Sequence, residues 1–541
     1  MKILFKPRQF INNLNQTKTC LLLGDVFLVF FSIALFNLKV IPMRTGDFIF
    51  FAALTLALAL YRPGWAFLLF IGTIILENIN LAPESFFIAI RPYQFIGALI
   101  ILAIIIRLFT KRLNFQLAKL KFPDYLVLIM AAAGFLSIFA APDKIDSLKL
   151  AVIFTSFAAL YYLVRCYIQN TDDLKKIVPF FIGSSAVVVL YGLWQNIRFI
   201  YGGANFETMP GRPNLTFTEP DWAGMYLIIL ISVLYSFSHF INSKFETLNP
   251  EQYQNPNLIA NRQSLIAKLI YYLFLVLAFI TLILTVSRSA WIGAFAAMSI
   301  FLFAILTNLR FKGWQWGEFL KQLSIIISAG IISLACVYIF NLTNFQLFNR
   351  VQSAGSGLQK ITISCTENKK PPESINSADE LEKFGCRHIN LEEIEKEKIA
   401  GNIIYEIYRD DPNINIRQKI YQKSWEQIKK HPLLGIGWGS IGMILGEDER
   451  GASLNSSNIF LEVWLGSGIV GFLAFSVLFF YILSRWIKNY FYSDNAWQKT
   501  VGLFMLISWF AIVISNLFNA GLFLGFLWVW LAAAQLKIDH N

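Results

Sequence analysis

Arginine residues recur in this sequence at the borders between apolar runs and polar segments. Arg288 lies in "TLILTVSRSAWIG" between two apolar runs, and Arg91 opens "RPYQF" before another. Arg212 lies in "MPGRPNLTFTEPDWAG", and Arg417 lies near the start of "NINIRQKIYQKSWEQIKK". A guanidinium donates paired hydrogen bonds to phosphate oxygens and never loses its charge. Several arginines facing one cavity therefore predict a site that binds a diphosphate and stabilises it as a leaving group.

Carboxylates accompany these arginines and could remove a proton from an attacking hydroxyl. Glu219 and Asp221 follow Arg212 closely, and Glu462 lies one turn inside the apolar run after "NSSN". A carboxylate within reach of a substrate hydroxyl can act as a general base. We therefore take these three carboxylates and Arg288 as candidate catalytic residues. Ser457 and Asn458, in the "NSSN" segment, are candidate contacts to the acceptor or to the loop.

Each of these residues also has a purely structural interpretation. Arg91 can extend to lipid headgroups from a helix end, and Arg288 can pair with a lipid phosphate. Arg212 can form a salt-bridged loop with the two carboxylates that follow it. Arg417, on a surface helix, is solvated by default.

Composition identifies the elements that must position these side chains. Of the 541 residues, 56% are hydrophobic and only 15% are charged, and the mean hydropathy is +0.55. Apolar runs long enough to cross about 30 Å of hydrocarbon recur along the whole chain. The sequence predicts an all-α polytopic membrane protein with about fourteen transmembrane helices (twelve to fourteen). Their expected centres are residues 28, 54, 71, 100, 133, 156, 187, 232, 276, 298, 332, 472, 508 and 527.

The composition also divides the chain into three parts. We expect about eleven transmembrane helices in 1–341, a large outward loop in 342–456, and about three further helices in 457–541. The first half of the loop is polar, rich in Lys and Glu, and resembles a flexible segment. The second half has apolar residues at helical spacing, which predicts an amphipathic helix over 415–430.

Basic residues set the expected orientation. Segments on one side of the predicted helices hold half of the 46 Lys and Arg residues, whereas the opposite short loops hold eight. The positive-inside rule then predicts cytoplasmic termini and an extracytoplasmic loop. The net charge of +12 is explained by anionic headgroups at these flanks, so no nucleic-acid partner is expected.

Two of the five cysteines, Cys365 and Cys386, fall in the outward loop. An oxidising compartment would favour a disulfide between them. No spacing of Cys and His resembles a metal site, and no cofactor is expected.

Several motifs together resemble the O-antigen ligase and polymerase superfamily. They are "GRPNLTFTEPDWAGMYL", "LTVSRSAWIGAF", "HPLLGIGWGSIG" and "NSSNIFLEVWLGSGIVGFLAF", in this order between about residues 205 and 475. The resemblance implies a multi-helix glycosyltransferase of the lipid-carrier type in the plasma (inner) membrane of a bacterium. Such enzymes transfer a glycan from undecaprenyl diphosphate to an acceptor hydroxyl at the outer face, without metal.

The resemblance also implies roles for particular residues. By motif position, the arginines that hold the diphosphate are Arg288, Arg212 and Arg417, and Arg91 is a further candidate. Ligases of the family commonly carry His-Asn where this chain has Ser457-Asn458. A histidine base is therefore not expected, and the departure favours a polysaccharide polymerase over a lipid A ligase. Chain-length regulators and flippases are the protein partners that such a polymerase would have.

Two other classes of function stay open. A transporter or flippase of lipid-linked saccharides would also have many helices, and it usually needs acidic residues deep in its spans. The clear candidates for such residues are Asp25, Glu77 and Glu462. A non-catalytic scaffold in a polysaccharide assembly complex is the third class.

Overall fold

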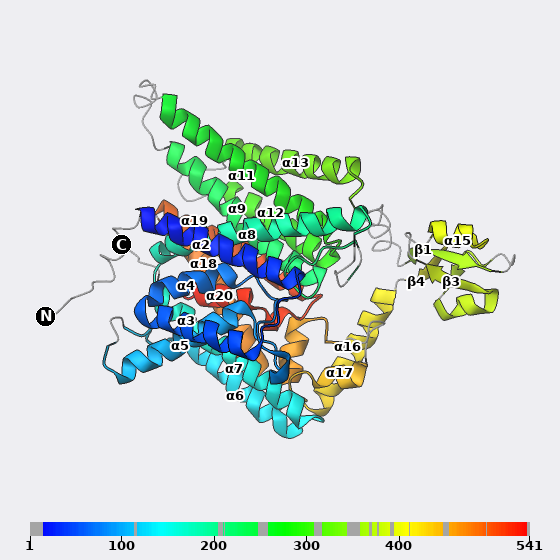
Figure 1. Cartoon of the computed structure of the whole chain (residues 1–541), viewed down its shortest axis with the longest axis horizontal. Helices are drawn as coiled ribbons and strands as arrows, with labels where there is room; N and C mark the ends of the chain where they lie inside the picture. Colours follow the sequence, from blue (N-terminus) through cyan, green and yellow to red (C-terminus); the bar gives the residue numbers. More distant parts are fainter. Residues whose placement is uncertain are drawn as a thin grey trace.

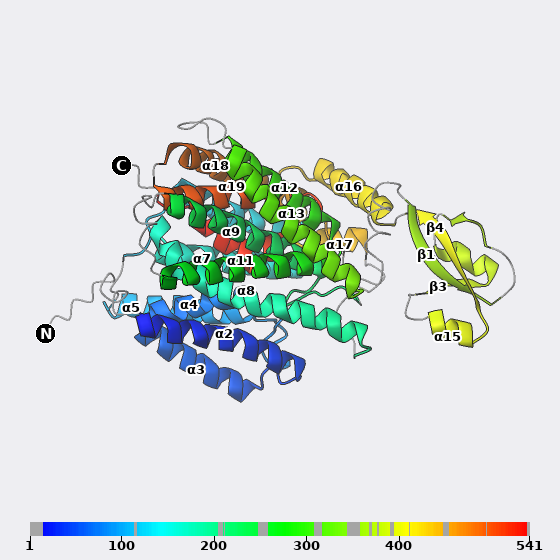
Figure 2. The ribbon, with the colours of Figure 1, turned by 90° about the horizontal axis from the view of Figure 1, so that it is seen from above.

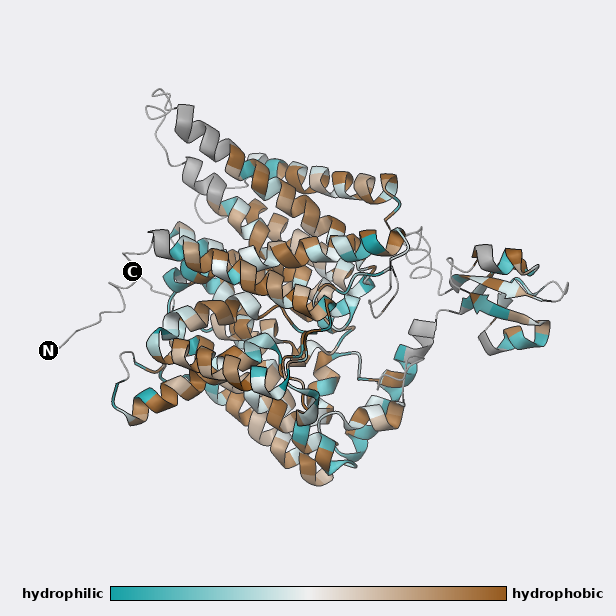
Figure 3. Ribbon diagram, viewed as in Figure 1, coloured by the Kyte–Doolittle hydropathy of each residue, from teal (hydrophilic) through white to brown (hydrophobic). Residues whose placement is uncertain are grey.

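The computed structural model describes residues 15–112, 116–203, 209, 211–246, 258–307, 316–342, 358–366, 371–375, 378–389, 394–410, 412–446, 454–493 and 495–537. Within these residues the chain forms a bundle of roughly aligned helices and a small sheet that stands off one end of it (Figure 1). The bundle is predominantly apolar, whereas polar residues are frequent in the sheet and in the helix nearest to it (Figure 3).

Long apolar runs form the bundle because a helix satisfies all of its backbone groups internally, as a membrane requires. Before the sheet the helices are α2 (Asn15–Asn37), α3 (Thr45–Tyr61), α4 (Pro63–Thr73), α5 (Pro92–Phe109), α6 (Phe122–Ser137), α7 (Lys144–Tyr167), α8 (Thr171–Ile200), α9 (Pro220–Glu246), α11 (Leu258–Leu284), α12 (Arg288–Leu306) and α13 (Trp316–Ile339). After the sheet they are α16 (Pro412–Lys430), α17 (Ser440–Leu445), α18 (Ile459–Tyr492), α19 (Ala496–Asn516) and α20 (Gly525–Ala533). Short 3-10 turns lie at η1 (Glu84–Phe86), η2 (Ile138–Ala140) and η5 (Gly521–Phe523).

Eleven helices of the described chain are long and apolar enough to cross a membrane. The other three expected spans coincide with α3, α4 and α20, which have 17, 11 and 9 residues. A membrane crossing normally needs about 20 residues. The structure therefore confirms an α-helical polytopic membrane protein and does not confirm fourteen crossings.

The two ends of the bundle differ. Helix α2 begins and helix α20 ends at one end of the bundle, and the sheet lies beyond the other (Figures 1 and 2). Helices α5, α9, α12, α18 and α20 each begin at the end that faces the sheet. We call it the sheet end of the bundle, and the assignment of this end to the outside of the cell stays a prediction.

The region expected to be a flexible polar loop contains a small folded module with a four-stranded sheet, inserted in a chain that is otherwise helical. The strands are β1 (Leu358–Cys365), β2 (Ser374–Ile375), β3 (Cys386–Ile389) and β4 (Ile403–Asp410), accompanied by η3 (Ala378–Phe384) and α15 (Ile394–Ile399). Their order in the sheet is β2-β4-β1-β3, with β1 antiparallel to β3 and β4 and with β2 parallel to β4.

Alternation along β1 builds the core of this module. Ile361, Ile363 and Cys365 are buried with Ile407 of β4 and Leu381 of η3. Successive residues of a strand point to opposite faces, so this period of two places them on one side of the sheet.

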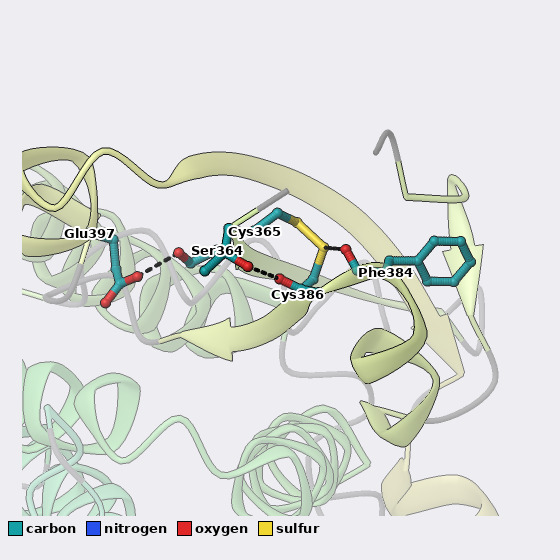
Figure 4. Close-up of a disulfide and its surroundings, with 7 residues drawn as sticks. Ser364, Cys365, Phe384, Cys386 and Glu397 are labelled. Atoms are coloured by element: carbon teal, nitrogen blue, oxygen red, sulfur yellow. Dashed lines mark hydrogen bonds between the residues drawn. A yellow bond between two sulfur atoms is a disulfide. The ribbon is translucent and has the colours of Figure 1, made fainter. Parts of the chain in front are cut away.

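A disulfide joins β1 to β3 in the module. Cys365 pairs with Cys386 in the strand register and is bonded to it through sulfur (Figure 4). The pair is thus located where the sequence predicted it. A cross-link of this kind restricts the unfolded chain and stabilises a domain too small to build a large core.

Helix α16 includes the amphipathic helix expected over 415–430. Ile420 and Ile428 are buried, whereas Lys429 and Lys430 are exposed. Figure 2 shows α16 between the sheet and the helix bundle.

Candidate functional site

Arg288 is the first residue of α12, at the sheet end of the bundle. The side chain is half-buried, and Ser287 precedes it as the N-cap, with its Oγ accepting from the Ala290 N–H. A helix N-terminus carries partial positive charge, so a cation there is unfavourable unless an anion is near. Both the N-terminus of α12 and the Arg288 guanidinium therefore contribute positive potential at this end of the helix.

The turn before α12 is tightly packed and strained. Val286 has a φ of 50°, a conformation that β-branched residues rarely adopt and that costs about 1–3 kcal/mol. A Cβ on Gly224 of α9 would lie 2.5 Å from the Cβ of Ala290. Close packing of α9 against α12 thus holds the turn in place, and strain of this kind is concentrated at functional sites.

Arg212 braces this turn from the loop between α8 and α9. The side chain is 5% exposed, and its Nε donates to the Thr285 carbonyl oxygen at 2.8 Å. Its Nη2 lies 3.5 Å from Oδ1 of Asp221, the second residue of α9. The salt-bridged loop considered from the sequence is therefore present, and it includes Asp221. A diphosphate bound to Arg212 would have to share it with these internal partners.

Hydrogen bonds to neighbouring elements hold the rest of the "RPNLTF" loop in place. Gln195 of α8 donates to the Asn214 side chain and accepts from the Leu215 N–H. Thr216 donates to the Ile75 carbonyl oxygen at 2.6 Å. Leu215, with a φ of 55°, is a second strained position, in the same loop as Arg212. Glu219, which ends the loop, is half-buried.

The start of α18 forms a polar cluster around Glu462. The side chain of Asn458 caps the helix by accepting from the N–H groups of Phe460 and Leu461. The Oε2 atom of Glu462 accepts from the Oγ of Ser456 at 2.7 Å and from its N–H at 3.2 Å. Within the described chain, no hydrogen bond to the other oxygen, Oε1, is found. Glu462 is thus buried and oriented, with one oxygen left for another partner.

Ser457 is the third strained position in the candidate motifs. Its φ is 49°, and its N–H donates to the side chain of Asn455. This conformation turns the chain directly before the helix cap, so Ser457 shapes the approach to α18.

The chain from residue 517, directly after α19, to residue 525, the first of α20, joins these pieces, and no motif in the sequence predicts it. We call it the α19–α20 segment. The Leu517 carbonyl oxygen accepts from Nδ2 of Asn458 and from the hydroxyl of Tyr421, both at 3.1 Å. The Nδ2 of Asn519 donates to the Oγ of Ser289, the residue after Arg288, at 2.8 Å.

Arg417 of α16 reaches the same segment. Its Nη2 donates to the Phe518 carbonyl oxygen at 3.4 Å, and its guanidinium lies 5.6 Å from the centre of the Phe518 ring. A guanidinium over an aromatic face is favourable. Arg417 is therefore not simply a solvated surface residue, because it contacts Phe518 through both a hydrogen bond and its ring.

Arg91 meets the other end of the α19–α20 segment through Glu77. The Nε of Arg91 lies 3.1 Å from Oε2 of Glu77, which also accepts from the hydroxyl of Tyr93. The Oε1 of Glu77 accepts from the N–H of Gly525, the first residue of α20, at 2.5 Å. Burial raises the pKa of Glu77, and the Arg91 charge and these hydrogen bonds oppose that rise. Arg91 is thus an ion-paired residue at the base of the site rather than a side chain extended to headgroups.

The "HPLLGIGWG" motif fills a break in α18. At Gly468, with φ 65° and ψ −171°, the helix is interrupted. The Ile436 N–H donates to the Leu465 carbonyl oxygen, and the Ile469 N–H donates to the Pro432 carbonyl oxygen. A Cβ on Gly468 would lie 2.0 Å from the Leu433 carbonyl oxygen, so only glycine permits this approach. The motif therefore supplies backbone partners to a broken helix, as membranes require.

Only some of the candidate residues lie together. Arg417 and Asn458 contact residues 518 and 517 directly, and Arg288 lies next to Ser289, which contacts Asn519. Arg212 lies behind the turn that precedes Arg288, and Arg91 lies at the far end of the α19–α20 segment. Among the described residues, no group of three or more His, Cys, Asp and Glu side chains is arranged to hold a metal ion.

These features define a polytopic helical membrane protein whose polar, arginine-rich site lies at the sheet end of its bundle. Residues 273–476 match a family model described as O-antigen ligase. This match covers less than half of the chain, and it supports the resemblance to the O-antigen ligase and polymerase superfamily that the motifs carry. No curated protein and no solved structure matches the chain. The matched residues include Arg288, Arg417 and Glu462, whereas Arg91, Arg212 and the α19–α20 segment lie outside them.

Proposed function

We propose that this protein transfers glycan units from undecaprenyl diphosphate to an acceptor hydroxyl at the outer face of the bacterial plasma membrane. It would act as a surface polysaccharide polymerase or ligase. The observation that supports this best is the convergence of α12, α16 and α18 on residues 517–519. Each element brings a residue suited to the reaction: Arg288, Arg417 and Glu462.

Arg288 and Arg417 are proposed to hold the donor diphosphate. Two helix N-termini, those of α12 and α18, add positive potential at the same end of the bundle. A doubly charged leaving group gains from such fixed positive groups as the bond to it breaks. Arg212 is proposed to position Arg288 through the Thr285 turn, and Arg91 to position the α19–α20 segment through Glu77.

Glu462 is proposed as the general base in preference to Glu219 and Asp221. Asp221 already forms an ion pair with Arg212 through its Oδ1 atom. Glu462 has one oxygen held by Ser456 and the other without a described partner. Ser457 would then contact the incoming acceptor, and Asn458 would orient the helix that carries Glu462 by capping it.

The proposed reaction is a single displacement. The acceptor oxygen forms a bond to the anomeric carbon while the bond from that carbon to the diphosphate oxygen breaks. The proton of the acceptor passes to Glu462, and undecaprenyl diphosphate leaves with the bonding electron pair. A single displacement of this kind inverts the anomeric configuration.

A reconstituted assay tests the proposal. Full-length protein in lipid vesicles would be mixed with lipid-linked oligosaccharide extracted from a strain that lacks the gene. We expect longer lipid-linked glycans from a polymerase, or a glycan on a new acceptor from a ligase, with release of undecaprenyl diphosphate. Transfer of intact donor across the bilayer without a new glycosidic bond would instead support the transporter alternative.

A further inference from the structure

An apolar groove lies on the bundle surface at the end opposite the candidate site. It has a volume of about 460 Å³ and is lined by Phe122 of α6 and by Val477, Phe480, Tyr481, Leu483, Ser484 and Ile487 of α18. Several of these side chains are largely exposed, with Phe480 at 68% and Phe122 at 55%. The groove therefore opens towards the surroundings of the bundle, where lipid chains would lie.

Cationic side chains lie close to residues of this groove, although they do not line it. Lys121 directly precedes Phe122, whose ring lies against that of Tyr481, and Arg485 is near enough to Tyr481 to interact with it electrostatically. Arg165 and Lys537 lie near enough to act on Lys121 electrostatically, and Asp124 is the carboxylate of the group. Burial and the nearby Arg165 and Arg485 charges lower the pKa of Lys121.

Asp124, the carboxylate of this cluster, already has partners of its own. Asp124 accepts from Nε of Arg165 at 3.1 Å and from the hydroxyl of Tyr161. Arg485 donates to the carbonyl oxygens of Ala534 and Leu536, which carry no net charge. In the described chain, no carboxylate forms an ion pair with Lys121 or Arg485. The cluster thus has four cations and one anion, and two of the cations flank the groove.

We propose that this groove binds an anionic phospholipid. An acyl chain would occupy the apolar groove, and the phosphate would accept hydrogen bonds from Lys121 and Arg485. Basic pockets between membrane helices are suited to anionic headgroups, each Lys or Arg contributing about 1 kcal/mol near the surface. A zwitterionic lipid would fill the groove equally well but would gain less from the cluster.

The proposed site is independent of glycan transfer. Helix α6 begins at the end of the bundle away from the sheet, whereas α12 and α18, which carry Arg288 and Glu462 near their first residues, begin at the sheet end (Figure 1). A bound lipid there would fasten α6, α18 and the C-terminal residues 534–536 together.

Native mass spectrometry of the full-length protein in detergent can test the proposal with dioleoyl phosphatidylglycerol and, separately, dioleoyl phosphatidylcholine. We expect tighter binding of phosphatidylglycerol, and Lys121→Gln should weaken that binding about fivefold. Ser484→Trp should fill the groove and displace the lipid. Lys488→Gln is the matched control, because Lys488 is exposed on the same helix but is not one of the charges that act on Lys121. It should change binding less than twofold.

Other outcomes would overturn the assignment. Equal binding of the two lipids, equal effects of the Lys121 and Lys488 variants, or unchanged binding in Ser484→Trp would each do so. Displacement of phosphatidylglycerol by equimolar undecaprenyl phosphate would identify the polyprenyl carrier as the occupant instead.

Discussion

The Nε of Arg212 donates to the carbonyl oxygen of Thr285 at 2.8 Å, across 73 positions of the chain. This bond ties the loop that precedes α9 to the turn that presents Arg288. Because the turn also contains the strained Val286, we propose that Arg212 helps to hold the conformation of Arg288.

Arg212→Ala should therefore lower stability as well as activity. It leaves a buried carbonyl oxygen without its donor and Asp221 without its cation, at a cost of about 1–3 kcal/mol. Thermal unfolding of the purified protein, followed by tryptophan fluorescence, measures the loss. Arg198→Ala, at the end of α8, is the control and should change the melting temperature little. An unaltered melting temperature in Arg212→Ala, with activity lost, would show that Arg212 binds substrate alone.

Glu462→Gln should remove the proposed base while retaining the local fold. The amide oxygen of Gln can still accept from Ser456, so α18 should begin as before. General-base catalysis contributes about 10²–10⁴ in rate, and a loss of this size is expected in the vesicle assay. Asp221→Asn is the comparison and should cost far less. Wild-type turnover in Glu462→Gln would exclude Glu462 as the base.

Membrane helices were predictable because their signal is local. Eleven of the fourteen expected spans coincide with helices of full length, and the arginines were expected at helix ends. The module was missed although β1 alternates Ile361, Ile363 and Cys365, because polar Lys- and Glu-rich residues follow it. Two short strands, one of only two residues, carry too little pattern to reveal a sheet.

The centre of the site could not be predicted for a different reason. Leu517 and Phe518 contribute through backbone carbonyl oxygens, which every residue has. The contact between Asn519 and Ser289 spans 230 positions, and that between Gly525 and Glu77 spans 448. Hydropathy and residue spacing describe residues that are close in sequence, so they cannot predict contacts between residues this far apart in the chain.

Asp25 distinguishes the enzyme from the transporter alternative. It is fully buried in α2, and its Oδ2 accepts from Ser184 of α8 at 2.9 Å. A Cβ on Gly72 would lie 2.0 Å from the Asp25 carboxyl oxygens, so α4 is tightly packed against them. Asp25→Asn keeps the size and one acceptor. We expect near-normal polymer from this variant, measured in a deletion strain. Loss of polymer with normal protein abundance would favour ion-coupled transport, because a carrier needs the ionisable group.

The inserted module should lose stability in acid through Glu397. Its carboxylate on α15 accepts from Ser364, as Figure 4 shows, and also from Asn402 and Arg387. These bonds hold the pKa of Glu397 below its ordinary value of 4.5. A lowered folded-state pKa contributes stability above the unfolded pKa, and this contribution is lost as pH falls through the folded value.

Amide hydrogen exchange in residues 394–410 can measure this effect. Glu397→Gln should increase exchange relative to wild type at pH 7, and the difference should shrink below pH 4.5. Glu406→Gln is the control, because Glu406 pairs with Lys360 at the surface and is 59% exposed. A difference that does not change with pH would show that the Glu397 charge is not responsible.

Arg288 gives the most direct test of the diphosphate site. If the guanidinium holds the leaving diphosphate, Arg288→Ala should reduce polymer formation by about 10²–10³, as the loss of a transition-state donor does. Arg288→Lys should recover little, because an ammonium cannot make the paired donation of a guanidinium. If Arg288 only anchors α12 to lipid headgroups, lysine should replace it, since both side chains reach the interface. Polysaccharide chain length in a complemented deletion strain, with membrane abundance checked by blotting, separates the two. Wild-type polymer from the lysine variant would remove Arg288 from the site.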